Sequence, residues 1–155
     1  MRENSHTRLT MPPHVIADPT LLELRIPLRL AVRLKQGLRI VPLWFEYRED
    51  SFWCASQADS LCVRALMRDP HCAFDLSTNE MPYRGLRGEA RVSCLPEAGA
   101  MQLDRLLHRY LGGLESPLAK RLRKRNEREV ALVIQPILMS HWDYAARMRG
   151  SVPHS

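Results

Sequence analysis

The feature that most limits the possible fold is a regular alternation of apolar and polar residues near the start of the chain. Leucine or valine occupies every second position from Leu28 to Leu34, and the positions between carry basic residues or alanine. A period of two places the apolar side chains on one face of a β-strand. Gln36-Gly37 then supplies a turn, and residues 38–47 predict a second strand. Pro42 in that second run has no backbone N–H to donate, which indicates a sheet edge or a bulge.

Further segments with the composition of strands and helices follow. Four more strands are expected, at residues 52–57, 71–77, 86–95 and 129–144. Helices are expected from Asp18-Pro19, from an N-cap at Asp59 to Met67, over residues 103–114, and from Ser116-Pro117 onward. The inward set of the fifth strand includes Gly88 and Ala90, small residues that indicate a crowded barrel interior. Six mostly antiparallel strands, with helices after the third and the fifth, predict a small closed barrel of the α+β class.

The length of 155 residues predicts one domain. We expect a flexible N-terminal arm over residues 1–17, the folded domain over residues 18–145, and a C-terminal tail over residues 146–155. Apolar residues make up 45% of the chain and charged residues 26%, which is the balance of an ordinary globular domain and not of a disordered one.

The net charge of +6 is concentrated in one segment. Residues 117–128 carry six Lys or Arg and one Glu. This segment contains no aromatic residue and matches no nucleic-acid-binding motif. We therefore expect a solvated, charged helix face there, and the alternative is a small barrel that binds nucleic acid through this segment.

The sequence also predicts the compartment. No secretory signal is visible, and the longest uncharged stretch, Val130 to Trp142, is too short to span a bilayer. The four cysteines form no C-x-x-C pair, and the six histidines are scattered singly, so neither a metal site nor a disulfide scaffold is expected. These features predict a cytoplasmic protein with reduced thiols and no membrane association.

One candidate site lies where the third strand meets the following helix. The helix N-terminus offers free backbone N–H groups, and Ser60 and Arg64 lie four residues apart on one helix face. Ser56, at the end of the strand, can point into the same space. These residues predict an anion site, and the alternative is an ordinary helix capped by Asp59 with a solvated arginine.

A second candidate feature is the flat apolar run Val41-Pro42-Leu43-Trp44. It can serve as a wall for a planar ring, whose edge would bond to neighbouring backbone groups, or it can belong to the core. The chain has no G-x-S-x-G, P-loop or G-x-G-x-x-G motif, and no nucleophile stands beside a base. Any chemistry would therefore come from a bound cofactor.

Taken in order, several segments resemble the FMN-binding split-barrel family related to pyridoxamine 5'-phosphate oxidase. They are Arg39–Tyr47, Phe52–Ser56, Asp59–Pro70, Pro82–Gly85, Arg87–Ala90 and Ser140–Tyr144. The resemblance covers roughly residues 18–145 and implies a six-stranded, mostly antiparallel split β-barrel with flanking helices. It also implies a homodimer that holds FMN at the subunit interface.

The resemblance further implies a flavoprotein that transfers hydride or electrons between FMN and a small organic substrate, with oxidation of pyridoxamine 5'-phosphate itself not expected. The alternative is a non-catalytic barrel that binds a flavin, a deazaflavin or haem, or no cofactor. The residues that the resemblance places at the cofactor are Arg39, Ile40, Val41, Pro42, Leu43, Trp44, Ala55, Ser56, Ser60, Leu61, Cys62, Arg64 and Trp142.

The chain departs from the family pattern at one point. Where the oxidase has a basic Arg-Lys pair that grips the phosphate, this chain has Leu61 and Cys62. Each charge-assisted hydrogen bond to a phosphate contributes about 1.5–3 kcal/mol. FMN binding is therefore expected to need compensation from Arg64 or from an arginine of the partner chain.

Overall fold

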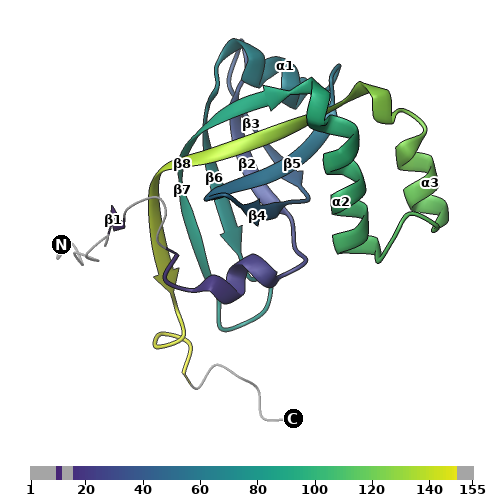
Figure 1. The fold of residues 1–155 in the computed structure, drawn as a ribbon. Coiled ribbons are helices and arrows are strands. Elements are labelled where there is room, and N and C mark those ends of the chain that lie inside the picture. The colour runs from purple at the N-terminus through teal and green to yellow at the C-terminus, as the bar shows by residue number, and fades with distance from the viewer. Residues whose placement is uncertain (1–9, 12–15, 150–155) are drawn as a thin grey trace.

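The computed structural model describes residues 10–11 and 16–149. Eight strands form one curled antiparallel sheet that wraps around an apolar core, with helices α2 and α3 on one side of it (Figure 1). The strands are β1 (Thr10–Met11), β2 (Leu28–Arg33), β3 (Leu38–Leu43), β4 (Glu46–Arg48), β5 (Ser51–Gln57), β6 (His71–Ser77), β7 (Arg84–Leu95) and β8 (Glu129–Asp143). The helices are α1 (Leu61–Arg68), α2 (Gly99–Leu111) and α3 (Pro117–Arg123), with short 3-10 turns η1 (Pro19–Glu23), η2 (Pro96–Ala98) and η3 (Asn126–Arg128).

The strand order is β3-β2-β6-β7-β8-β5-β4, and β1 pairs separately with β8. Seven strands lie along this path where six were expected, because the predicted strand 38–47 is broken into β3 and β4. These two strands lie at opposite ends of the path, so the expected closed barrel is wrong and the split barrel is confirmed. The break falls at Trp44-Phe45, where the Phe45 N–H donates to the Tyr110 hydroxyl (3.2 Å) instead of to a neighbouring strand.

The period-two prediction for the first long strand is confirmed. Leu28, Leu30 and Val32 are buried in the core, and the residues between them are half-buried. Pro42 lies in β3, at an end of the sheet, as its missing N–H requires.

The crowding expected at Gly88 comes from the backbone of a neighbouring strand. A β-bulge shifts the register between β7 and β8 at Glu89/Ala90, so that Gly88 faces Met139 while Ala90 faces Pro136. A Cβ atom on Gly88 would lie 1.9 Å from the Leu138 carbonyl oxygen. Glycine therefore allows the long strand β8 to bend around the core.

Two helices cover the sheet from opposite sides. Helix α1 adds Cys62, Val63, Ala65 and Leu66 to the core enclosed by the sheet. Helix α2 lies against the other face of β5 and β8 and forms a second apolar cluster with Ala119 of α3. The two faces of β5 therefore serve two different cores.

The predicted N-cap of α1 at Asp59 is wrong. Ser60 is the N-cap, and its hydroxyl oxygen accepts from the Val63 N–H (3.1 Å). The Asp59 carboxylate instead faces Arg125 (3.2 Å) and Arg128 (3.8 Å). Both residue types are good caps, so sequence preference could not separate them. The helix ends before Asp69-Pro70, as predicted.

Parts of the predicted arm and tail are described. Thr10 and Met11 pair with Ser140 and Met139 of β8, and the Ala17 N–H donates to His141 Nε2 (3.0 Å). Residues 1–9, 12–15 and 150–155, the rest of the predicted arm and the end of the predicted tail, lie outside the described residues. Within the described part of the chain, no helix has the length and apolar character needed to cross a bilayer.

Candidate functional site

A groove lies between helix α1 and the turn that joins β2 to β3. Its volume is about 750 Å³. One wall comes from residues 34–36, which follow β2, and the other comes from α1 and the turn that precedes it. The lining residues are Leu34, Lys35, Gln36, Ala58, Leu61, Arg64, Met67 and Arg68. The groove thus joins the first hairpin to the helix that the sequence singled out for an anion site.

The charged side chains of this groove are all cationic. Lys35, Arg64 and Arg68 line it, and no described Asp or Glu does. None of the three forms an ion pair with another described residue. Nearby Arg33, by contrast, lies 3.4 Å from the Asp69 carboxylate. Three uncompensated cations beside apolar walls favour an amphipathic anion.

The edge of β3 borders the same hairpin. This strand pairs with β2 on one side and with no described strand on the other. Its outer edge therefore offers free backbone N–H and C=O groups that a ligand can bond. The segment 39–43, predicted to line a ring, forms this edge.

The side chains of β3 face two ways. Arg39, Val41 and Leu43 pair with the buried residues of β2 and share the face that points to the core. Ile40 and Pro42 lie on the opposite face. Leu43 is buried and Val41 half-buried, whereas Ile40 is 67% exposed. The predicted wall is therefore an edge with two distinct faces, and a flat ligand would meet backbone and alternate side chains only.

The structure places Trp44 against helix α2. Its ring stacks on Tyr110, with centroids 4.8 Å apart and planes 8° from parallel. The Tyr110 hydroxyl donates to the Ile26 carbonyl (2.8 Å) and accepts from the Phe45 N–H (3.2 Å). Trp44 therefore anchors the corner after β3, and its ring is turned toward α2.

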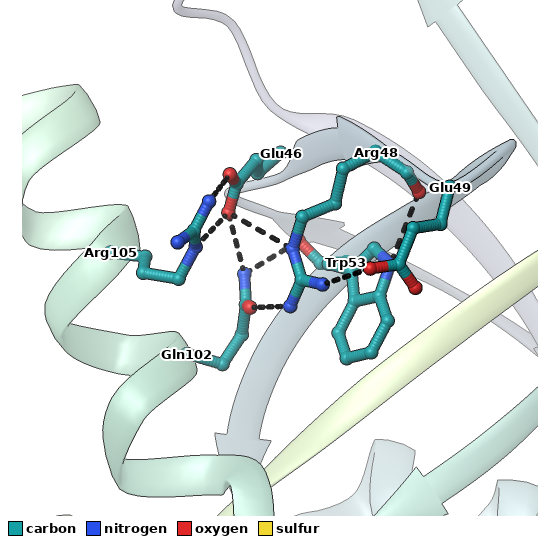
Figure 2. A network of polar contacts seen from close by, with 6 residues as sticks. All are labelled: Glu46, Arg48, Glu49, Trp53, Gln102 and Arg105. Atoms are coloured by element: carbon teal, nitrogen blue, oxygen red, sulfur yellow. Dashed lines mark hydrogen bonds and ion pairs between the residues drawn. The ribbon is translucent and has the colours of Figure 1, made fainter.

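A polar network holds the next strand to the same helix (Figure 2). Arg105 forms a bidentate ion pair with Glu46, and Gln102 donates to Glu46 (3.4 Å) and to the Trp53 carbonyl (3.3 Å). Arg48 donates to Gln102 (3.1 Å), and its guanidinium lies 3.5 Å from the centroid of the Trp53 ring. The Arg105 hydrogen bond lowers the pKa of Glu46, so the pair stays ionised at neutral pH. Helix α2 thereby fixes the β4–β5 hairpin.

The two serines of the predicted anion site are in contact. Ser56 Oγ donates to Ser60 Oγ (3.0 Å), which also accepts from the Val63 N–H. The Ser60 hydroxyl proton then remains able to donate to a ligand. Ala55 points to the other face of β5, into the cluster beside α2. It does not share the space of the two serines.

The two residues that replace the family's basic pair have different environments. Leu61 is 37% exposed and lines the groove. Cys62 is 3% exposed and belongs to the core. Burial, together with nearby Cys94, raises the pKa of the Cys62 thiol to about 11. Of these two positions, only Leu61 presents its side chain to the groove.

Trp142 is far from these residues within one chain. It lies near the end of β8, opposite Gly85, whereas Ser56 pairs with Val130 at the start of the same strand. Its ring is tilted against Tyr144, and its indole nitrogen is buried without a hydrogen-bond partner among the described residues. Trp142 could meet a ligand held at α1 only if another copy of the chain supplied it.

Sequence reasoning missed two of the three cations of the groove. Lys35 follows the alternating run of residues 28–34, and Arg68 is the last residue of α1. The available signals were the Gln36-Gly37 turn after Lys35 and the spacing of four residues between Arg64 and Arg68. Their convergence depends on how the hairpin packs beside the helix.

The residues present fit the phosphate end of a flavin mononucleotide. Lys35, Arg64 and Arg68 supply ammonium and guanidinium donors, and the Ser60 hydroxyl lies at the start of the same helix. Leu61 and Met67 supply apolar surface. When bound, FMN would supply reversible hydride or electron transfer.

A scan against models of known families finds no match, and no curated protein matches the chain. Solved structures do match. One is a conserved hypothetical protein from Mycobacterium tuberculosis, with 19% identity, a TM-score of 0.70 and coverage of 94% of each chain. Another is described as an F420 reductase, with 23% identity and a TM-score of 0.68, covering 81% of this chain and 98% of the other.

A third match is a candidate pyridoxamine 5'-phosphate oxidase from Listeria innocua. It is 13% identical, with a TM-score of 0.60, and the match covers 79% of this chain and 92% of the other. At these identities the likeness concerns the fold. The chain therefore has the split-barrel fold found in pyridoxamine 5'-phosphate oxidase-like proteins and in F420 reductase, as the resemblance in its sequence predicts.

Proposed function

We propose that this protein is an FMN-binding flavoprotein that transfers hydride or electrons between the flavin and a small organic substrate. The observation that carries the proposal is the cationic groove beside the free edge of β3. A flavin mononucleotide has a dianionic phosphate and a flat ring with hydrogen-bonding edges. The phosphate needs the cations of the groove, and the ring needs the free backbone groups of β3. Two proteins with this fold are described as an F420 reductase and as a candidate pyridoxamine 5'-phosphate oxidase, and this supports a redox role for the site.

In this arrangement the phosphate occupies the groove. Arg64 and Arg68 approach it from α1, and Lys35 approaches it from the hairpin turn. The free backbone groups on the outer edge of β3 would bond the polar edge of the ring. The protein contributes binding, orientation and exclusion of water, and the flavin contributes the chemistry.

The proposal includes a homodimer with the cofactor at its interface. The outer face of the sheet carries a row that crosses five strands: Ile40, Ala31, Ala73, Glu89 and Leu138. Ile40 is 67% exposed and Leu138 46% exposed, and between them lie two alanines and the exposed Glu89. A second copy would cover the apolar ends of this row and could bring its Trp142 toward the flavin.

The proposal is tested by the visible spectrum and by titration. Purified protein should show flavin absorption that bleaches on reduction, or should acquire it when FMN is added. Arg64→Gln should weaken FMN about tenfold, because one charge-assisted contact to phosphate is lost, and should change the affinity for riboflavin little. Arg121→Gln removes an equal charge outside the groove and is the control. A protein that binds neither FMN nor riboflavin would overturn the proposal.

The alternative is a binding protein without catalysis, holding a flavin, a deazaflavin or haem. Leu61, in place of a family cation, is the observation that favours it. The same spectra separate the candidates, since haem and deazaflavin absorb differently from FMN. Reduced flavin that passes no electrons to any acceptor would favour the binding role. The cytoplasmic location expected from the sequence remains a prediction.

A further inference from the structure

The segment that follows helix α3 reaches the turn in front of α1 and is tied to it. The Ala58 N–H donates to the Arg128 carbonyl (2.8 Å), and Gln57 Nε2 donates to the Arg125 carbonyl (3.3 Å). Ala58 itself lines the cationic groove. These two hydrogen bonds to the Arg125 and Arg128 carbonyls hold the basic segment beside Gln57 and Ala58.

The guanidinium groups of these arginines share one carboxylate. Arg125 lies 3.2 Å and Arg128 3.8 Å from the same oxygen of Asp59. All three side chains are about half exposed. Two cations on one exposed carboxylate leave an excess positive charge, and exposed ion pairs of this kind contribute little to stability.

We propose that Arg125 and Arg128 are reserve ligands for the anionic group of the cofactor, held in place by Asp59 until that group binds. The inference rests on the proposed function. A dianionic phosphate at the start of α1 offers stronger charge-assisted bonds than the exposed Asp59 carboxylate does. The arginines would therefore transfer from Asp59 to the phosphate. This transfer would replace the cations that the chain lacks at positions 61 and 62.

The neighbouring basic residues provide a matched control. Arg121 belongs to the same segment, is exposed, and forms no ion pair with a described residue. Its replacement by glutamine removes the same unit of charge without touching Asp59. If replacing Arg125 or Arg128 changes FMN binding more than replacing Arg121 does, the additional change is therefore specific to the position.

The test compares FMN with riboflavin, which has the same ring and no phosphate. The measured quantity is the ratio of the two dissociation constants, obtained by fluorescence titration of the full chain. Arg125→Gln and Arg128→Gln should each reduce the preference for FMN about tenfold, and Arg121→Gln should leave it near the wild-type value. Asp59→Asn should increase the preference, because it removes the competing carboxylate. A structural role would weaken both probes equally and leave the ratio unchanged.

The outcomes separate the two proposals. Wild-type protein that binds neither probe overturns the proposed function. Wild-type protein that prefers FMN, with Arg125→Gln and Arg128→Gln no different from Arg121→Gln, overturns only the present inference. A loss of FMN preference in Asp59→Asn also overturns it, since Asp59 would then assist binding instead of competing with the phosphate.

Discussion

At the residue scale, the structure depends on a few positions where no other side chain fits. Gly88 is one, because the backbone of β8 passes directly over it. We expect Gly88→Ala to destabilise the protein by at least about 3 kcal/mol, since strand backbone must move to admit a methyl group. Chemical denaturation measures the free energy of unfolding.

Gly112 is the matched control for this substitution. It ends α2 with φ 76°, and a Cβ atom there would meet nothing within 4 Å. Gly112→Ala should cost only about 1–2 kcal/mol, the cost of the left-handed conformation. Equal losses in the two variants would contradict the steric explanation.

His141 is a second position with a specific residue requirement. Burial lowers the pKa of its ring below the usual value of 6.5, and Nε2 accepts the Ala17 N–H, so the folded state favours the neutral form. Folding therefore releases a proton near the normal histidine pKa. The stabilisation is complete above pH 6.5 and is lost as the pH falls through the lowered pKa of the folded state.

We expect wild-type protein to lose more unfolding free energy between pH 7 and pH 5 than His141→Gln does. Glutamine can keep an acceptor near the Ala17 N–H and has no proton to gain in this range. Carboxylates that titrate below pH 5 affect both proteins alike. Parallel pH profiles for the two proteins would contradict the role assigned to His141.

At the element scale, helix α2 organises the strands around the break in the barrel. Gln102 is 1% exposed and bonds Glu46, Arg48 and the Trp53 carbonyl (Figure 2). Gln102→Leu keeps the approximate volume but leaves these groups without their partner. We expect a loss of about 2–3 kcal/mol in the free energy of unfolding, because buried polar groups become unsatisfied.

The adjacent residue tests whether this effect is specific. Met101 lies on the same helix and is 67% exposed. Met101→Ala should change the free energy of unfolding by less than about 0.5 kcal/mol. If Gln102→Leu proves as harmless as Met101→Ala, the network does not stabilise the hairpin.

At the scale of the whole molecule, the outer sheet face is the surface that the proposed dimer covers. Ile40→Asp places a charge at one of the two apolar ends of the row that crosses this face, and should shift the protein from dimer to monomer in analytical ultracentrifugation. Met101 has the same 67% exposure but lies on α2. Met101→Asp should leave the association unchanged. A monomeric wild-type protein, or identical behaviour of the two variants, would contradict the proposed interface.

Much of the fold follows from local sequence pattern. The alternation over residues 28–34 produces β2, the Asp69-Pro70 pair ends α1, and Ser116 caps α3 as predicted. These features depend on neighbouring residues in the chain, so they can be predicted from the sequence. The N-cap of α1 could not be predicted, because Asp59 and Ser60 suit the position equally well. Asp59 instead forms ion pairs with Arg125 and Arg128, which are distant in the sequence.

Some features of the candidate site likewise follow from local sequence, and others depend on tertiary packing. The sequence predicted Ser60 and Arg64 on one face of α1, an edge or a bulge at Pro42, and Leu61 and Cys62 in place of the family's basic pair. The packing of the whole chain brings Lys35 into the same groove as Arg64, turns Trp44 toward Tyr110 and buries Cys62. Periodicity and caps act over a few residues, whereas a groove needs segments far apart in the chain to pack side by side. That packing is fixed by the whole core and not by any local pattern.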